Sequence, residues 1–366
     1  MQCTLAREQL LNPVLHTEKT TVKKHTLPVL ACILLEVTGD TLFLSSTNLE
    51  VGVRFSVPVE KTTNGSVAVS GSVFAHVISS LPSGTEITLS SSTGYLTIQS
   101  SEGSSKIALY DTEDFPVLPE VEDGKEILLP AKQLRETLNA VVYCASTSTI
   151  KPELSSVFVY PNGNTLIAAA TDSFRLAEKK TSLKQFVDSE PFLIPSKSIA
   201  NLLRILEQVE GDIQVKSNKN QLSITLPAIY ITLRLVPGTF PDYTQIIPKE
   251  FVSEATMLTF DFERTLRKAT AFGDQFNQTT ITISPKEKKF TAHTKNDAVG
   301  ETTDSLAAAI SGKDLVISFN QKYLLDSLHS ITSDSITIQF GGQSQPAIIR
   351  PVGNDGFLYL VMPMNR

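Results

Sequence analysis

The clearest pattern along the chain is an alternation of apolar and polar residues that recurs three times. It runs through residues 86–99 (EITLSSSTGYLTIQ), 212–226 (DIQVKSNKNQLSITL) and 335–350 (SITIQFGGQSQPAIIR), and turn residues interrupt it each time. A period of two that is broken by Ser, Asn or Gly is typical of antiparallel hairpins. The sequence therefore predicts three hairpins at similar spacing.

Segments with apolar residues at helical spacing accompany these hairpins. One precedes each hairpin, and in the first of them Phe74, Val77, Ile78 and Leu81 fall on one helical face. Another helical segment opens each third of the chain. The six predicted helices cover residues 6–15, 72–82, 130–142, 196–208, 261–272 and 321–331.

Related strings recur between these elements and indicate an internal repeat. Thr47-Asn48, Thr171-Asp172 and Lys295-Asn296 each follow an alternating segment, and EDFPVLPE (113–120) corresponds to GTFPDYTQIIP (238–248). The order helix, hairpin, helix, hairpin predicts an α+β fold of three similar domains, at residues 1–123, 124–250 and 251–366. Chance alternation in a β-rich protein is the alternative.

Composition narrows the class of protein. With 41% apolar and 19% charged residues, the 366-residue chain has enough core-forming material to be globular. Its 3 cysteines are scattered, which favours a reducing compartment. No apolar run reaches the length of about 18 residues that a membrane span needs, and the start lacks a signal-peptide pattern, so we expect a cytoplasmic protein.

The net charge of −6 argues against a nucleic-acid partner when it is taken alone. The charge is unevenly distributed, however, because the helical segments are slightly basic whereas the remaining residues are acidic. Solvated helix faces explain such a bias equally well. Charge therefore leaves the question of nucleic acid open.

Several ordered motifs resemble one known family. TDSFRLAEKK (171–180), GTFPDYTQIIPKE (238–250), SFNQKYLLDSL (318–328), LVMPM (360–364) and KHTLPVL (24–30) are similar to segments of the bacterial β sliding clamps. These clamps are the processivity subunits of the replicative DNA polymerase. The resemblance extends over essentially the whole chain and implies three α+β domains, each with two helices. It further implies that two chains join head to tail into a closed ring around double-stranded DNA.

The resemblance also implies a site for short linear peptides of the replicative DNA polymerase, the clamp loader and repair proteins, and it implies no cofactor. Its expected lining is Leu154, Thr171, Ser173, Phe174, Arg175, Leu176, Pro241, Gln245, Ile246, Ser344, Pro346, Leu360, Val361, Met362, Pro363 and Met364. Methionine side chains adapt to varied ligands, although Met362 and Met364 are also compatible with ordinary core positions. Phe174 replaces a His or Tyr and Gln245 replaces an Arg that many members carry, so peptide preference is expected to differ.

Two further sets of residues follow from the resemblance. Residues expected to face DNA are Lys24, Lys132, Arg135, Lys151, Lys197, Arg204, Arg264, Arg267, Lys268 and Lys322. Ile107 and Phe272 are the candidates for an apolar contact between the two chains of the ring. The second helix carries Ser72 and Val73 where family members often carry basic residues, which puts a DNA contact there in doubt.

An enzyme and an adhesin are the rival classes. The chain contains no P-loop, GxGxxG, HExxH or GxSxG motif, and its five histidines are scattered. Asp111, Glu113 and Asp114 cluster before a Phe-Pro pair, but a solvated turn explains them better than paired catalytic acids. We therefore predict no intrinsic catalysis and no metal site. A β-rich repeat protein of the adhesin or lectin kind is disfavoured by the missing signal sequence.

Overall fold

The computed structural model describes residues 1–22, 26–187, 189–207 and 209–364, without the side chains of 185–187. Lys24, one of the predicted DNA-facing residues, lies outside the described residues. The chain forms two compact units. The first comprises Met1–Lys132 and Lys197–Leu235, and the second comprises Gln133–Ser196 and Val236–Arg366.

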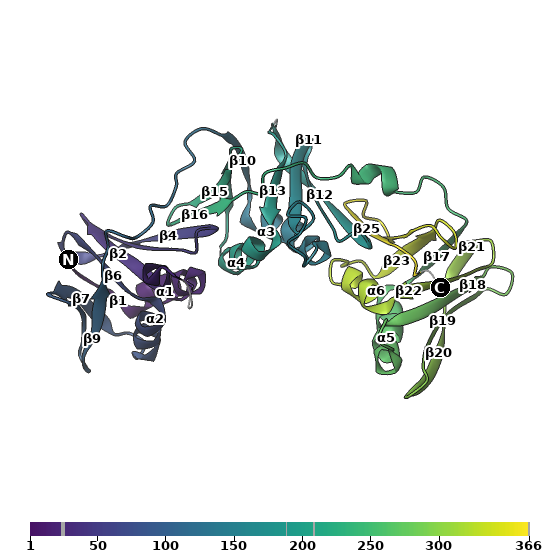
Figure 1. The fold of residues 1–366 in the computed structure, drawn as a ribbon, viewed down its shortest axis with the longest axis horizontal. Coiled ribbons are helices and arrows are strands. Elements are labelled where there is room, and N and C mark those ends of the chain that lie inside the picture. Colours follow the sequence, from purple (N-terminus) through teal and green to yellow (C-terminus); the bar gives the residue numbers. More distant parts are fainter. Residues whose placement is uncertain (23–25, 188, 208, 365–366) are drawn as a thin grey trace. The chain divides into compact units, whose positions relative to one another are not determined.

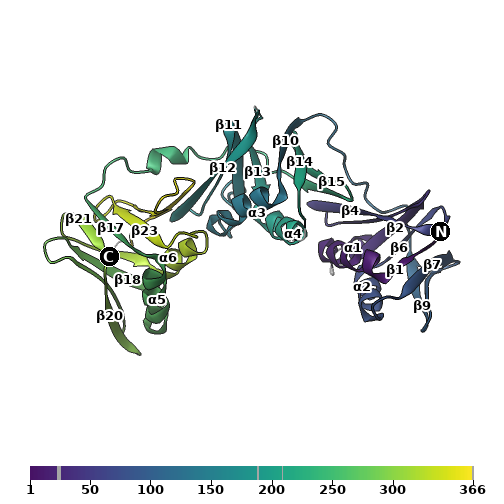
Figure 2. The same cartoon turned by 180° about the vertical axis from the view of Figure 1, so that it is seen from behind.

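A 13-stranded antiparallel sheet dominates the first unit (Figure 1). In order across the sheet its strands are β10 (Lys125–Pro130), β14 (Asp212–Ser217), β15 (Gln221–Leu226), β16 (Ile229–Arg234), β4 (Val51–Pro58), β3 (Thr41–Thr47), β2 (Cys32–Thr38), β6 (Gly65–Ser70), β9 (Gly103–Tyr110), β8 (Tyr95–Ser100), β7 (Glu86–Ser92), β1 (Gln2–Ala6) and β5 (Glu60–Thr63). Helices α1 (Arg7–Thr20) and α2 (Gly71–Ser80) lie side by side, and Figure 2 shows the same pairing from behind. The short η1 (Pro28–Ala31) precedes β2, and α4 (Ser196–Leu206) belongs to this unit from Lys197 onward.

The second unit contains an eight-stranded and a four-stranded antiparallel sheet. The larger sheet has the order β13 (Phe192–Pro195), β11 (Ser156–Thr171), β12 (Arg175–Val187), β25 (Phe357–Val361), β24 (Ala347–Pro351), β23 (Ser335–Phe340), β17 (Ser253–Leu258) and β21 (Ala309–Gly312). The smaller has the order β20 (Gly300–Leu306), β19 (Lys289–Asn296), β18 (Gln278–Ser284) and β22 (Leu315–Asn320). The helical elements of the second unit are α3 (Ala131–Asn139, mostly in this unit), α5 (Thr259–Ala269), α6 (Gln321–Leu328), η2 (Val142–Cys144), η3 (Tyr243–Ile246) and η4 (Thr270–Phe272).

All six predicted helices and all three predicted hairpins are present in the described residues. The hairpins are β7–β8, β14–β15 and β23–β24. The first helix is longer than predicted, because it continues past Pro13 to Thr20 with Leu10, Val14 and Thr17 buried along one face. A continuing buried stripe stabilises a helix more than local propensity does.

The internal repeat is visible in one turn that occurs at corresponding places. Leu49 and Ser173 adopt the left-handed conformation, with φ of 73° and 77°. Asn48 and Asp172 each accept two backbone hydrogen bonds through Oδ1, from the residues two and three positions later. Asn296 Oδ1 likewise accepts the backbone N–H of Ala298. Asn and Asp suit this role because their side chains close such turns.

The middle third of the chain is divided between the two units by strand pairing. Strand β16 pairs with β4 of the first third, whereas β12 pairs with β25 of the last third. The predicted boundaries after residues 123 and 250 fall between strands, and they stay predictions. None of the helices in the described ranges is both long and apolar enough to cross a bilayer.

Candidate functional site

The turn between β11 and β12 presents an aromatic side chain to solvent. Thr171 Oγ1 donates a 2.7 Å hydrogen bond to the carbonyl of Arg175, and Asp172 Oδ1 accepts the backbone N–H groups of Phe174 and Arg175 at 3.0 Å. The left-handed Ser173 completes the reversal. Phe174 is consequently 62% exposed, an uncommon environment for a phenylalanine.

Arg175, which directly follows this aromatic residue, donates three hydrogen bonds within the protein itself. Its Nε donates to Asp172 at 2.9 Å, its Nη1 to Asp326 at 2.6 Å, and its Nη2 to the carbonyl of Tyr143 at 2.8 Å. The guanidinium also lies 4.4 Å from the ring centroid of Tyr323. Burial opposes the charged form, but the hydrogen bond to Asp326 and the nearby negative charge raise the pKa of Arg175. These contacts tie the turn to η2 and α6.

The C-terminal strand runs beside the same turn. Val361 is the antiparallel partner of Arg175, and the backbone N–H of Met362 donates to the carbonyl of Phe174 at 2.8 Å. Met364 then donates to the carbonyl of Ser318 in β22. The predicted LVMPM segment is therefore held on both sides, and it leaves the Met362 side chain exposed.

The second Phe-Pro stretch, residues 238–248, supplies a neighbouring wall. Tyr243 is buried, and its hydroxyl donates to Glu178 Oε2 at 2.5 Å and lies 3.2 Å from the hydroxyl of Tyr160. Burial and the bond to Glu178 raise the pKa of Tyr243, so it stays a neutral donor. With Tyr243 anchored, Ile246 at the end of η3 is left 49% exposed.

A single hydrophobic cluster joins these segments. Leu176 of β12, Tyr243 of η3, Ile348 of β24 and Leu360 of β25 all belong to it. The loop after β23 approaches the Phe-Pro stretch as well, since a Cβ built on Gly341 would lie 3.6 Å from Pro248. The three exposed side chains Phe174, Ile246 and Met362 are hereafter called the apolar patch.

The predicted lining residues thus separate into three groups by exposure. Exposed ones are Ser173, Phe174, Pro241, Gln245, Ile246, Ser344 and Met362; half-buried ones are Arg175, Pro363 and Met364; buried ones are Leu154, Thr171, Leu176, Pro346, Leu360 and Val361. The buried side chains lie beneath the surface as support. Arg175, one of the expected lining residues, donates instead to Asp172, Asp326 and Tyr143 of the protein itself.

Sequence reasoning missed the polar partners that hold these walls. Asp326 and Tyr143 reach Arg175 across 151 and 32 positions, and Glu178 of β12 reaches Tyr243 across 65. No local signal marks these pairings. Asp242 could have been found, because it is the one charged residue in GTFPDYTQIIP. Its carboxylate accepts hydrogen bonds from Thr244 and, at 2.8 Å, from the amide of Gln245.

The predicted DNA-facing residues on α5 are paired with acidic neighbours. Arg264 lies 2.9 Å from Asp261, and Lys268 lies 2.8 Å from Asp304. Arg267 is paired in the same way with Glu263, at 2.6 Å. The positive charge of α5 is therefore largely balanced locally. Of the other predicted residues, Lys132, Lys151, Lys197, Arg204 and Lys322 are exposed and Arg135 is half-buried.

The two predicted interface residues differ in environment. Ile107 is 5% exposed and lies opposite Leu96 within the sheet, so its side chain belongs to the core of its own unit. Phe272 is half-buried, and its ring lies 3.7 Å from a Cβ built on Gly300 at the start of β20. Val299, the residue before that glycine, is 62% exposed.

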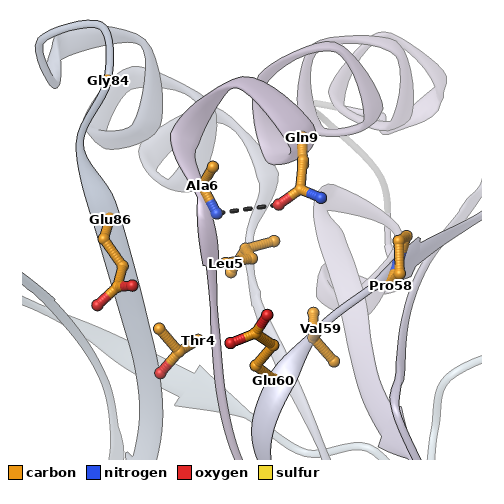
Figure 3. Close-up of a pocket in the computed structure, with 9 residues that line it drawn as sticks. All are labelled: Thr4, Leu5, Ala6, Gln9, Pro58, Val59, Glu60, Gly84 and Glu86. Atoms are coloured by element: carbon orange, nitrogen blue, oxygen red, sulfur yellow. Dashed lines mark hydrogen bonds between the residues drawn. The ribbon is translucent and has the colours of Figure 1, made fainter.

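A pocket of about 350 Å³ lies elsewhere, in the first unit (Figure 3). The carboxylates of Glu60 and Glu86 lie on either side of Thr4, and Gln9 hydrogen-bonds the backbone N–H of Ala6 at 3.0 Å. None of the predicted site residues lines it. No group of three or more His, Cys, Asp or Glu residues suited to a metal occurs in the part of the chain that the structure describes.

Three family models match the chain consecutively. They are the N-terminal domain of the DNA polymerase III beta subunit at residues 1–119, its central domain at 128–242 and its C-terminal domain at 244–365. A curated relative, the beta sliding clamp of Staphylococcus epidermidis, is 28% identical over all of this chain and 99% of its own length. The beta sliding clamp of Staphylococcus aureus is 27% identical over the same shares.

Solved structures of similar proteins share the fold along the whole chain. The DNA polymerase III beta subunit of Thermotoga maritima has a TM-score of 0.93 at 25% identity, with 100% of this chain and 99% of that one covered. A sliding clamp from Bartonella birtlesii bound to griselimycin has a TM-score of 0.94 at 26% identity, with both chains fully covered. The sliding clamp of Bacillus subtilis, at 23% identity, has a TM-score of 0.95 over 100% of this chain and 99% of that one.

Proposed function

Because this chain belongs to the bacterial β sliding clamp family, we propose that it encircles duplex DNA and tethers the replicative DNA polymerase during processive synthesis. The observation that carries this proposal is the ordered match of all three β-subunit domains to a chain that folds as three repeats. Such a protein acts on the chromosome in the cytoplasm and has no catalytic step of its own. The adhesin-like alternative has no support in these comparisons.

Retention on DNA by topology has a direct test. The protein is loaded on a nicked circular duplex, and the circle is then cut open. A ring slides off the free ends, so the bound fraction should fall to background after cutting and persist on the uncut circle. Equal retention on both DNAs would mean that contacts to phosphate, rather than encirclement, hold the protein.

The absence of catalysis is tested with a polymerase assay. The purified protein should extend no primer alone, yet it should lengthen the products of its cognate polymerase. Primer extension by the protein alone, retained after further purification, would contradict the proposal.

Strand pairing inside the chain supports closure of the ring by two copies. At both internal junctions an antiparallel pair joins successive repeats, β16 to β4 and β25 to β12. In the described residues, β20 pairs only with β19, and residues 103–107 of β9 pair only with β8. These two edges occupy the repeat positions of β4 and β16. In a head-to-tail homodimer these two edges, one from each copy, would pair and form a further junction of the same kind.

The repeat also predicts the register of that junction. Ile229 pairs with Phe55 and Leu233 with Val51 at the first junction. Thr47, Thr171 and Lys295 follow one another at a spacing of 124 residues. Two such steps place Val299 at the repeat position of Val51, and Thr303 at that of Phe55. Ile107 is the repeat equivalent of Leu233, because Ile107 lies opposite Leu96 just as Leu233 lies opposite Leu222. Leu233 pairs with Val51, so Ile107 is expected to pair with Val299 of the second copy. Ile107 would then contribute its backbone to the pairing, and its side chain would lie on the same face of the joined sheet as that of Val299.

Native mass measurement tests the homodimer, with an expected mass near twice 39.9 kDa. Val299→Glu should weaken dimerisation at least about tenfold, because a carboxylate would be buried in the junction. Val316→Glu is the control, since Val316 is 45% exposed on β22 at the opposite edge of the same sheet. Equal dimer stability in both variants would overturn the proposed junction.

The apolar patch is the proposed docking point for linear peptides of the polymerase, the clamp loader and repair proteins. Removing residues 362–366 should abolish polymerase binding and leave the dimer intact, because Met362 lies on the surface beside Phe174. Phe174→Ala should weaken binding at least about tenfold, whereas Val352→Ala, at an equally apolar exposed position, should not. Loss of the dimer together with peptide binding would show that the segment is misplaced.

A further inference from the structure

The segments that carry the apolar patch and its neighbouring walls contain few cationic side chains. Residues 238–248 contain one charged side chain, Asp242, while residues 341–347 and 360–364 contain none. The turn at 171–176 adds Asp172 and Arg175, which are paired with each other. Any charge that a bound peptide meets on these segments is therefore set mainly by carboxylates.

Asp242 is exposed at the start of η3, on the same short segment as Ile246. Its Oδ1 accepts hydrogen bonds from the backbone N–H and hydroxyl of Thr244, at 3.2 and 2.6 Å, and its Oδ2 accepts one from Gln245. The side-chain bonds to Thr244 and Gln245 hold the pKa of Asp242 below its usual range. The carboxylate is therefore ionised and held in place throughout the neutral pH range.

Arg175 does not offset this negative charge. Its guanidinium binds both Asp172 and Asp326, so the three groups together carry one net negative charge. Only 11% of the Arg175 side chain is accessible to solvent. An acidic residue of a peptide would thus find its nearest guanidinium already paired.

Three exposed lysines lie on adjoining segments: Lys151 three residues before Leu154, Lys249 directly after Pro248, and Lys322 beside Tyr323. All three oppose the effect of the carboxylates on an incoming charge. The contribution of Asp242 must accordingly be measured by its removal, with the lysines left in place.

We propose that this surface selects peptides that carry a lysine or arginine next to their apolar anchor, with Asp242 as the residue that recognises the cation. The inference rests on the proposed peptide-binding function of the apolar patch. It adds a chemical class of partner, a mixed apolar and cationic peptide, to that function. Gln245 acts as the positioning residue, because its amide holds Oδ2 of Asp242.

The test uses the full-length protein and three fluorescent peptides that share one apolar anchor. They differ in one flanking residue, which is Lys, Gln or Glu, and the substitution is made on each side of the anchor in turn. Fluorescence anisotropy should give the order Lys, Gln, Glu, with about three- to tenfold between the first and the last on at least one side, as expected for an exposed ion pair. Raising the salt from about 50 mM to about 500 mM should shrink the difference by screening.

Asp242→Asn removes the charge and keeps an oxygen that accepts the Thr244 hydrogen bond, so the segment should retain its fold. In this variant the Lys-to-Glu ratio should fall below about twofold. Asp297→Asn is the control, because Asp297 is an exposed aspartate on another turn of the same unit, paired with Lys295. It should leave the ratio unchanged.

The outcomes distinguish cation recognition by Asp242 from peptide binding at the apolar patch. Equal binding of the three peptides, or an unchanged ratio in Asp242→Asn, would overturn the inference and leave the peptide site standing. Binding by none of the peptides would overturn the proposed site and the inference with it.

Discussion

Replacing Arg175 by methionine should loosen the turn that carries Phe174. Methionine approximates the length of the side chain but makes none of its hydrogen bonds to Asp172, Asp326 and Tyr143. The two carboxylates, whose side chains are 15% and 24% exposed, would then face each other without a cation. The backbone carbonyl of Tyr143 would also lose its donor.

The size of the effect follows from this geometry. Two hydrogen bonds between charged groups are worth about 1.5–3 kcal/mol each, but their sum overstates the loss because burying the guanidinium costs desolvation. Removing one member of a buried ion pair costs about 3–5 kcal/mol. Arg267 forms a comparably short pair with Glu263 on the surface, with 62% of its side chain exposed. Such a pair is worth about 0.5 kcal/mol or less.

Hydrogen–deuterium exchange measures the loss locally, which suits a chain with more than one compact unit. In Arg175→Met, the amides of residues 174–177 and of Met362 should exchange at least about a hundredfold faster than in the parent protein. Arg175→Lys should give a smaller acceleration, since the charge remains but the planar fork is lost. Arg267→Met should leave these amides unchanged. Equal exchange in the two methionine variants would refute the view that the guanidinium holds the turn.

Two further changes test other parts of the second unit. Tyr243→Phe should destabilise the wall that carries Ile246 by about 1–3 kcal/mol, because the buried carboxylate of Glu178 would lose its phenolic donor; unchanged exchange at the amides of residues 243–247 would contradict this. Gly312→Ala should lower the thermal unfolding temperature by several degrees, because the glycine has a φ of 102° and a Cβ there would lie 2.2 Å from the carbonyl oxygen of Val252. Gly342→Ala is the control with a similar φ of 135° and open space around it, and it should cost less.

The regular elements could be predicted from the sequence because they depend on local patterns. Alternation at 86–99 and helical spacing at Phe74 and Ile78 report which face of each element is buried, and both elements are found there. The recurrence of Asn48, Asp172 and Asn296 in the sequence indicated the repeat. In the structure Asn48 and Asp172 close the same turn with two backbone hydrogen bonds each, whereas Asn296 accepts one, from Ala298. The structure therefore contains the helix and the hairpin that these local patterns predict.

Contacts between distant segments could not be predicted in this way. Asp326 reaches Arg175 across 151 positions, and Glu178 reaches Tyr243 across 65. Arg175 was expected to line the peptide site because of the resemblance to the family. Only the packing of α6 and η2 against the turn shows that three of its donors are already paired.

The two Phe-Pro stretches recur because each spans a junction between repeats. Leu118 of the first stretch packs on β4, since a Cβ on Gly52 would lie 2.5 Å from it, and the hydroxyl of Tyr230 in β16 donates to the carbonyl of Pro119. Tyr243 of the second stretch likewise bonds to β12 and packs against β25.

The two junctions nevertheless differ at the surface. Glu50 and Val51 occupy the repeat positions of Phe174 and Arg175, so the first junction lacks both the exposed aromatic ring and the guanidinium network. Each exit segment buries one side chain, Leu118 at the first junction and Tyr243 at the second, and exposes another, Val117 and Ile246. The exposed aromatic ring and the guanidinium network occur only at the second of these two junctions. A partner peptide is therefore expected there.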